Sequence, residues 1–200
     1  MAAAKRLSEA ERKKEIMDSA AKVIAAKGLG KATMEDIIAG TTLSKGGVYH
    51  YYGNVIEIFK DIMISGIDYR NNIIKEHLVE CEKGGESKFM AKQLVDKVID
   101  NNPLMPLYVE FLIEKKRNPE LNNIMEELQE QTKERFKAIS IDYSGWLFDP
   151  QIFQFVTDFM NALASDVLDA RENFKKNRQY LEATFTYLFE QVKEKTDGSL

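Results

Sequence analysis

The sequence is poor in cysteine and proline: it holds one cysteine, Cys81, and four prolines in 200 residues. A lone cysteine excludes an internal disulfide and suits a reducing compartment. No stretch approaches the ~18 consecutive apolar residues that a membrane span needs, and the first residues lack the apolar core of a secretory signal. We therefore expect a cytoplasmic protein without a membrane partner. The 44% of hydrophobic residues and the few prolines predict a folded, helix-rich chain.

The residue patterns of the common catalytic sites are also missing. His77 and Cys81 would lie one turn apart on a helix, but no further clustered ligands complete a zinc site. There is no Glu-x-x-His pair for a di-iron bundle, no phosphate-binding glycine loop and no nucleophile elbow. We therefore expect a protein that is not an enzyme, with no catalytic residue, no metal site and no cofactor.

Charge is distributed unevenly along the chain. The formal net charge is −4, but residues 1–54 carry +3 and the remaining residues −7. A basic first quarter on an acidic body favours one-ended binding to a polyanion, because attraction to phosphates is local and screened beyond about 10 Å. A chance fluctuation of a few charges is the alternative interpretation.

Apolar residues recur at helical spacing almost throughout, and no strand pattern stands out. Helix starts are well marked by a capping box at Ser8 to Glu11, by Thr33 and Ser44 as N-caps, and by a second capping box at Asn54. The sequence therefore predicts an all-α fold of about nine helices. The first three begin near residues 8, 33 and 44, and the others span 54–81, 89–99, 104–116, 119–139, 150–171 and 173–195.

The segment 33–53 carries the clearest functional signal. It predicts two short helices joined by a tight turn, which is the shape of an element that enters the DNA major groove. Six apolar residues are spaced to pack this pair against the flanking helices: Met34, Ile37, Ile38, Leu43, Val48 and Tyr52. The residues between them, at 45–47 and 49–51, are then left mainly outside.

The second of these short helices has the chemistry of a DNA contact. Tyr49 and Tyr51 can donate phenolic hydrogen bonds to phosphate, and Lys45 can contact phosphate or guanine. His50 is as readily an ordinary surface residue as a DNA contact. The pair Gly46-Gly47 costs a helix about 1 kcal/mol per glycine, which close approach of the backbone to DNA would explain; a loose loop is the alternative.

The stretches T33-M-E-D-I-I and L43-S-K-G-G-V-Y-H-Y-Y-G resemble the DNA-binding domain of TetR-family transcriptional regulators. The resemblance implies a homodimer, most often a repressor, with a helix-turn-helix domain (residues 1–53) and a larger ligand-binding and dimerisation domain (54–200). It also implies these DNA-binding residues: Thr33, Ser44, Lys45, Gly46, Gly47, Tyr49, His50 and Tyr51. Four positions depart from the family pattern, namely Ile38, Thr42, Gly47 and Val55. Thr42 stands where a turn glycine is common, Gly47 lacks a side chain that often reads the groove, and Val55 stands where a phosphate-binding lysine is usual.

Two C-terminal helices carry more apolar surface than one core needs. The helix 150–171 has a wide apolar arc, and the last helix adds an apolar stripe with tyrosines beside it. We predict that both pair with their symmetry mates, as the resemblance also implies. A large monomeric core is the alternative. The predicted interface residues are Phe155, Leu163, Val167, Leu181, Phe185 and Leu188.

Methionines and aromatics of the same body could line a pocket for an inducer, which we then expect to be largely apolar. They fill cores as readily as they line pockets, so core packing is the alternative for each. Glu110 and Glu114 lie one turn apart and could receive a cationic ligand, although a solvated helix face is the commoner role of such a pair. The predicted ligand-binding residues are Tyr69, Met105, Tyr108, Phe111, Leu112, Phe159 and Met160.

Together these patterns predict a ligand-responsive DNA-binding transcriptional regulator. Its expected partners are a double-stranded, palindromic DNA operator, a small-molecule inducer that releases it, and a second copy of the chain. Two alternatives remain at this level, a helical small-molecule-binding bundle without DNA affinity and a dimeric protein-interaction module.

Overall fold

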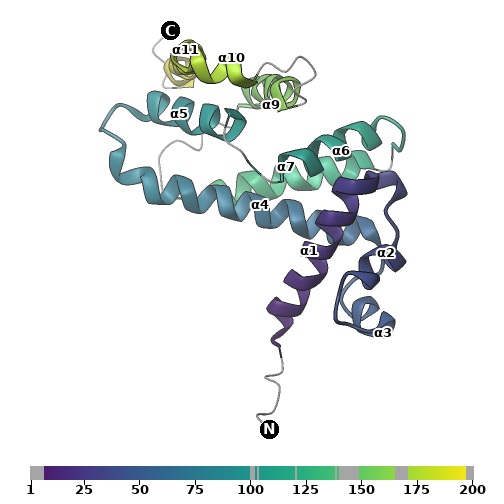
Figure 1. Cartoon of the computed structure of the whole chain (residues 1–200). Coiled ribbons are helices and arrows are strands. Elements are labelled where there is room, and N and C mark those ends of the chain that lie inside the picture. Colours follow the sequence, from purple (N-terminus) through teal and green to yellow (C-terminus); the bar gives the residue numbers. More distant parts are fainter. Residues whose placement is uncertain are drawn as a thin grey trace. The chain divides into compact units, whose positions relative to one another are not determined.

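The protein is described here by a computed structural model that covers residues 7–99, 102, 104–119, 121–137, 139, 149–164 and 171–196, apart from the side chains of residues 98, 160, 163, 164 and 196. Within these residues there are ten α-helices, two short 3-10 helices and no strand, so the predicted all-α class is confirmed (Figure 1). None of the described helices is long and apolar enough to cross a membrane. The helices are α1 (Glu9–Lys27), η1 (Leu29–Lys31), α2 (Met34–Ala39), α3 (Lys45–Tyr49), α4 (Val55–His77), η2 (Leu78–Glu80), α5 (Glu86–Ile99), α6 (Met105–Lys115), α7 (Leu121–Lys137), α9 (Pro150–Ala164), α10 (Arg171–Lys176) and α11 (Arg178–Thr196).

Side chains just before the first residue begin these helices as the sequence predicts. Ser8 Oγ accepts a hydrogen bond from the Glu11 amide at 3.2 Å, and the Glu11 carboxylate accepts one from the Ser8 amide at 2.7 Å. Thr33 caps α2 and Ser44 caps α3 by the same bond to the third residue of each helix. These bonds satisfy amides that have no partner inside the first turn, which is why the helices start where they do.

Several helix boundaries differ from the prediction; α5, for example, begins at Glu86 and not at Phe89. The helix predicted to reach Cys81 ends at His77, and one 3-10 turn follows it. The predicted last helix is two helices, α10 and α11, separated at Asn177. The Asn177 side-chain amide donates to the backbone oxygen of Asn173 at 3.0 Å and to its side-chain oxygen at 2.9 Å. An asparagine that bonds locally in this way competes with helix continuation.

Contacts along the chain divide it into two compact units. The first unit holds residues 1–66 and 104–128, and thus α1 to α3, α6 and one end each of α4 and α7; the second holds residues 67–103 and 129–200. These units do not follow the linear division at residue 53, so the two separable domains remain a prediction.

The core of the first unit positions the two short helices. Ile16 of α1, Ile37 of α2 and Val48 of α3 are all fully buried. Phe59 of α4 is also fully buried and stacks on Phe111 of α6, with ring centroids 5.1 Å apart. Burying a large apolar side chain contributes about 1.5–3 kcal/mol, so α2 and α3 are held by their inner faces although each is too short to be stable alone.

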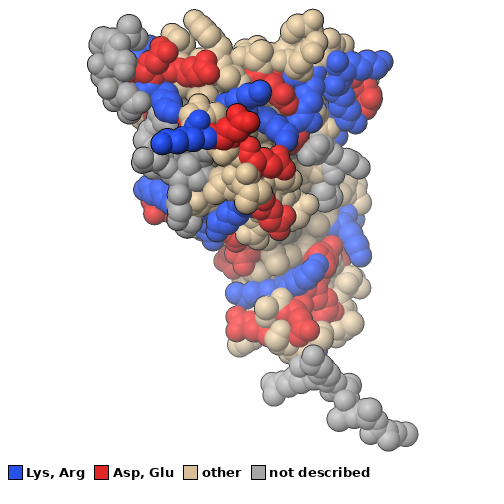
Figure 2. All heavy atoms as spheres, turned by 90° about the vertical axis from the view of Figure 1, so that its left-hand side faces the viewer, with Lys and Arg blue, Asp and Glu red and all other residues tan. Residues whose placement is uncertain are grey.

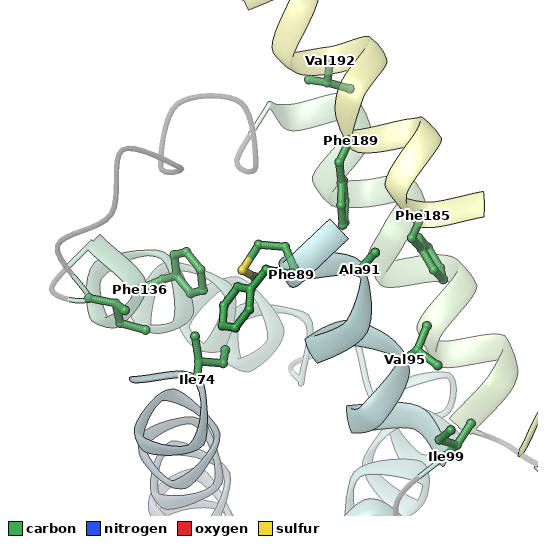
Figure 3. Packing of buried hydrophobic residues seen from close by; sticks show 11 residues of the cluster. Ile74, Phe89, Ala91, Val95, Ile99, Phe136, Phe185, Phe189 and Val192 are labelled. Carbon is green, nitrogen blue, oxygen red and sulfur yellow. The ribbon is translucent and has the colours of Figure 1, made fainter. Parts of the chain in front are cut away.

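The second unit has an aromatic core between α5 and α11 (Figure 3). Phe185 and Phe189 of α11 are 2% and 1% exposed and lie opposite Ala91 and Val95 of α5. At the other side of α5, Phe89 lies with Ile74 of α4 and Phe136 of α7 in the same cluster. Helix α5 is therefore packed on two sides, which makes it the centre of this unit.

Candidate nucleic-acid interface

Helix α2 is anchored to α1 through its own carbonyl end. Ser19 Oγ of α1 donates to the backbone oxygen of Ile37 at 2.7 Å, and Ser19 is only 5% exposed. Gly40 follows directly, and a Cβ at that position would collide with Ser19 Oγ. The close approach of the two helices therefore requires glycine at residue 40.

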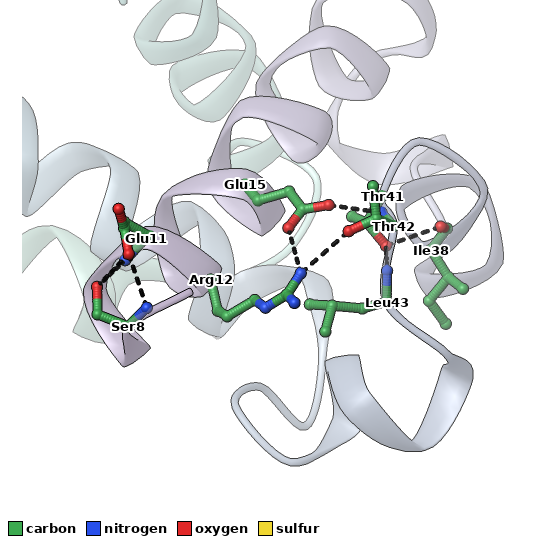
Figure 4. Close-up of polar contacts among 8 residues, drawn as sticks. All are labelled: Ser8, Glu11, Arg12, Glu15, Ile38, Thr41, Thr42 and Leu43. Carbon is green, nitrogen blue, oxygen red and sulfur yellow. Dashed lines mark hydrogen bonds and ion pairs between the residues drawn. The ribbon is translucent and has the colours of Figure 1, made fainter. Parts of the chain in front are cut away.

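The turn between α2 and α3 is tied to α1 by a polar network (Figure 4). The Thr42 amide donates to Glu15 Oε1 at 2.5 Å, and Arg12 Nη1 donates to Thr42 Oγ1 at 3.0 Å and to Glu15 Oε2 at 3.0 Å. Thr41 Oγ1 donates to the Ile38 oxygen, closing the end of α2. Hydrogen bonds from Thr42, followed by Arg12, lower the pKa of Glu15 below its ordinary value. This network holds the turn at Thr42 against α1, and sequence reasoning missed both Arg12 and Glu15.

Helix α3 divides cleanly into a buried and an open face. Val48 is fully buried, and Tyr52 just beyond the helix is 4% exposed. Lys45, Tyr49 and His50 are exposed, with Tyr49 at 41%. The remaining predicted DNA-binding residues also reach the surface: Thr33, Ser44 and Gly46 are exposed, and Gly47 and Tyr51 are half-buried. The structure thus brings all the predicted residues of α3 and its cap to one short helix with its back held in the core.

Tyr52 fixes the buried face of α3. Its hydroxyl donates to Asp61 Oδ2 of α4 at 2.9 Å, and the Lys13 ammonium lies 5.9 Å from its ring centroid. Burial, and then the hydrogen bond to the Asp61 carboxylate, raise the pKa of Tyr52, so the phenol stays protonated. A side chain that touches both α1 and α4 fixes the end of α3 against both helices.

The two glycines of α3 differ in their surroundings. A Cβ on Gly46 would meet no atom within 4 Å, whereas a Cβ on Gly47 would lie 3.3 Å from Leu43 Cδ2 and 3.4 Å from Ser44 Oγ. Gly47 is therefore partly explained by packing inside the protein. Gly46 is not, because the chain itself leaves room for a side chain there.

Most cations of the first unit are paired with acids rather than gathered into a basic patch. Lys45 Nζ lies 3.3 Å from Glu35 and 5.8 Å from the Tyr49 ring centroid, and Lys27 Nζ lies 2.6 Å from Asp36. The face in Figure 2 shows Lys and Arg interspersed with Asp and Glu. Both partners of the Lys45–Glu35 pair are about two thirds exposed, and exposed pairs of this kind are weak. Lys45 can therefore exchange Glu35 for a stronger anion.

The start of α4 lacks a cation where the family pattern has lysine. Asn54 Oδ1 accepts from the Glu57 amide at 2.9 Å, and the Glu57 carboxylate accepts from the Gly53 amide at 2.7 Å. Glu57 thus reaches the amide of Gly53 and not that of the N-cap Asn54, so only half of the predicted capping box forms, and a negative charge lies at the start of α4. Helix amides and the dipole cannot replace the missing lysine well, because Glu57 already occupies part of that positive end.

The predicted ligand-binding residues fall into both units. In the first unit Met105 and Phe111 are buried, and Tyr108 lies 6.4 Å from Phe111 between ring centroids, with Leu112 half-buried beside them. In the second unit Phe159 contacts Phe185 edge-on at 5.3 Å, and the Met160 side chain is outside the described residues. Tyr69 is 63% exposed, which leaves its assignment to an internal pocket without support. The pocket stays a prediction.

The two carboxylates predicted as a cation site lie against a backbone turn. A Cβ on Gly28 would be 2.9 Å from Glu110 Oε2, and one on Gly30 would be 2.5 Å from Glu114 Oε2. Their role toward a ligand also stays a prediction. Among the described residues, no group of three His, Cys, Asp or Glu side chains could hold a metal ion.

One predicted interface residue needs a correction. Phe185 is 2% exposed and belongs to the core of the second unit, so it cannot present its ring to a partner. Leu181 and Leu188 are half-buried against the same core, whereas Phe155 is 53% exposed. The Leu163 side chain and the whole of Val167 lie outside the described residues. The exposed aromatics of α11 are instead Tyr180 at 65% and Tyr187 at 66%, which the sequence pattern had placed beside the apolar stripe.

Comparison with known proteins gives the family of the segment that contains α2 and α3. Residues 16–62 match the family model described as "Bacterial regulatory proteins, tetR family". The chain is also 27% identical over 137 residues to YfiR of Bacillus subtilis (strain 168), described as an uncharacterized HTH-type transcriptional regulator. That match covers 64% of this chain, and the chain spans about 63% of the length of YfiR.

The fold is similar to solved structures over almost the whole chain. Salmonella enterica GusR gives a TM-score of 0.67 at 14% identity, covering 94% of this chain and 98% of that one. The fatty acid degradation regulator FadR from Bacillus halodurans gives 0.57 at 15% identity, with 94% and 96% covered. Residues 16–62 are therefore assigned to the TetR family of regulatory proteins, as the sequence resemblance implied. That family consists of regulators, so the prediction that the chain is not an enzyme is confirmed.

Proposed function

We propose that the protein is a ligand-responsive transcriptional regulator of the cytoplasm, a repressor that binds a palindromic DNA operator as a homodimer and is released by a small-molecule inducer. The observation that carries the proposal is the open face of α3. Lys45, Tyr49 and His50 are exposed on a helix whose other face is fixed by Val48 and Tyr52. An exposed row of donors on a rigidly held short helix is what a major groove accommodates.

Each polar group of this face has a separate task in the proposed complex. Lys45 exchanges Glu35 for a phosphate or a guanine edge, and the Tyr49 hydroxyl donates to phosphate. Thr33, at the start of α2, contacts a phosphate on the neighbouring backbone. Gly46 lets the backbone of α3 approach the DNA, since no protein atom fills the space beside it.

Binding is proposed to occur as a homodimer. Two recognition helices about 34 Å apart would reach successive major grooves on one side of the DNA. The exposed aromatics Phe155, Tyr180 and Tyr187 on α9 and α11 supply apolar surface for self-association. Sedimentation or light scattering at micromolar concentration tests this step, and a monomer mass contradicts it.

The inducer is proposed to act through α4, which runs without a break from Val55 to His77 and so contributes residues to both units. A ligand that favours one tilt of α4 would change the spacing of the two recognition helices. The coupling equals the difference in ligand affinity between the two states. A ligand that binds tightly but leaves operator affinity unchanged contradicts this part of the proposal.

Fluorescence anisotropy with DNA from upstream of the protein's own gene tests DNA binding. We expect a specific site, strong salt dependence, and weaker binding for both Lys45→Ala and Tyr49→Phe. Lys45→Ala should also reduce the slope of log affinity against log salt by about one if Lys45 contacts phosphate. Lys88→Ala, an exposed lysine of α5 in the second unit, is the matched control and should bind normally. Equal affinity of all four proteins for the DNA would reject the assignment of α3.

A further inference from the structure

The second unit contains buried polar groups without partners, which are uncommon in a folded protein. Asn71 of α4 is 7% exposed and Gln93 of α5 is 2% exposed. Among the residues that the structure describes, Asn71 Nδ2 has no acceptor and Gln93 Oε1 has no donor. His77 Nδ1 is a third buried atom of this kind in the same unit. Each such group destabilises the fold while it stays unpaired, so Asn71 and Gln93 call for a partner.

Arg70 and Ile74 place the α4 segment that carries Asn71 beside α5. Arg70, next to Asn71 on α4, donates from its guanidinium to the backbone oxygen of Gln93. One turn further along α4, Ile74 lies in the same cluster as Phe89 of α5. Phe89 and Gln93 are four residues apart, so they follow one another along a single stripe of α5. That stripe therefore faces the Arg70–Ile74 segment of α4.

Lys97 continues the same stripe four residues beyond Gln93. Among the described residues no carboxylate lies within ion-pair distance of its ammonium, although fifteen pairs of that kind occur elsewhere. Desolvation, followed by the nearby Arg70 charge, lowers the pKa of Lys97. Its residue surface is nevertheless exposed. The Lys97 side chain is thus close to a second cation and open to a small molecule from solvent.

We propose that Lys97, with Arg70, Asn71 and Gln93, forms a site for a small organic anion that has an apolar body. The acidic group of such a ligand would supply the counter-charge that no described carboxylate gives Lys97, and an acceptor for Asn71 Nδ2. A hydroxyl or N–H near that acidic group would donate to Gln93 Oε1. The apolar body would lie along the stripe toward Phe89 and Ile74. This changes the expected inducer from a largely apolar molecule to an amphipathic anion.

A pair of fluorescent probes tests the site in the full chain. 8-Anilinonaphthalene-1-sulfonate carries a sulfonate beside an N–H, and N-phenyl-1-naphthylamine has the same skeleton without the sulfonate. We expect the sulfonate probe to bind the wild type saturably. Lys97→Met should weaken it roughly tenfold or more, as loss of a charge-assisted contact does, while the neutral probe changes less than twofold.

Two further variants separate charge from structure. Lys97→Arg keeps the cation and should keep the preference for the sulfonate probe. Lys88→Met is the control, because residue 88 lies nine positions earlier and so on the opposite side of α5. The proposal is overturned if the wild type does not bind the sulfonate probe, if Lys97→Met binds it normally, or if both probes lose affinity equally.

The role of this site as an effector site rests on the proposed regulator function, but probe binding is measured without DNA. If the sulfonate probe needs Lys97 and also lowers the anisotropy of the operator complex, site and regulation are both supported. If the protein binds no DNA, the proposed function fails while the result for Lys97 still decides the anion site.

Discussion

Gly46→Ala separates two explanations of the glycine pair in α3. If Gly46 is merely part of a loose turn, a methyl group there should change little on the DNA side. If it allows the backbone to approach DNA, the same methyl group should harm binding while it improves the helix. A steric clash inside the protein would not confuse the result, because the added Cβ would meet no described protein atom within 4 Å. Residue 46 also already lies inside a helix.

The effect on stability follows from helix propensity. Replacing an unstrained helical glycine with alanine stabilises a protein by about 0.4–1 kcal/mol. For a protein of this size that corresponds to a rise in melting temperature of about 1–4 °C. Gly47→Ala should gain less, since its Cβ would lie 3.3 Å from Leu43 Cδ2. Thermal unfolding followed by circular dichroism measures both values.

The effect on DNA affinity has the opposite sign. Losing one backbone contact to phosphate removes a charge-assisted hydrogen bond of about 1.5–3 kcal/mol, so we expect operator affinity to fall tenfold or more for Gly46→Ala. Anisotropy titration at fixed salt measures this change. A variant that is more stable and binds the operator as well as the wild type would refute close approach at residue 46.

Three further predictions concern stability and assembly. Tyr52→Phe should lower the free energy of unfolding by about 1–2 kcal/mol in urea titrations, because Asp61 loses a buried donor. The folded state raises the pKa of Tyr52 above 10, so the stability difference between wild type and variant should shrink as pH rises past 10. A difference that stays constant with pH would argue against the hydrogen bond. Hydrogen bonds hold the pKa of Glu15 below 4.5 in the folded protein, so the wild type should be more stable than Glu15→Gln above pH 4.5. The two stabilities should converge as pH falls below 4.5, and parallel acid-unfolding curves would contradict this. Phe185→Ala should destabilise the protein by about 3–5 kcal/mol, because it truncates a core side chain. Tyr187→Ala, on an exposed face, should leave the core intact and weaken dimerisation measured by light scattering. The reverse pattern would exchange the two roles.

The sequence by itself determined the features that depend on neighbouring residues. Helix starts at Ser8, Thr33 and Asn54 were predictable because each cap bonds an amide three residues away, and α3 was recognisable from the order of its small, basic and aromatic residues. The resemblance to the TetR family followed from that same local stretch.

Tertiary structure decided whatever joins residues far apart in the chain. Arg12 and Glu15 reach Thr42 across about thirty positions, and Gly40 is needed only because Ser19 approaches it from another helix. The stripe from Phe89 to Lys97 could be interpreted as a binding surface only after the fold placed Arg70 and Ile74 of α4 beside it. An apolar residue such as Phe185 carries no local sign of whether it faces its own core or a partner, because helical periodicity is the same in both cases. Only the packing of α11 on α5 settled that choice.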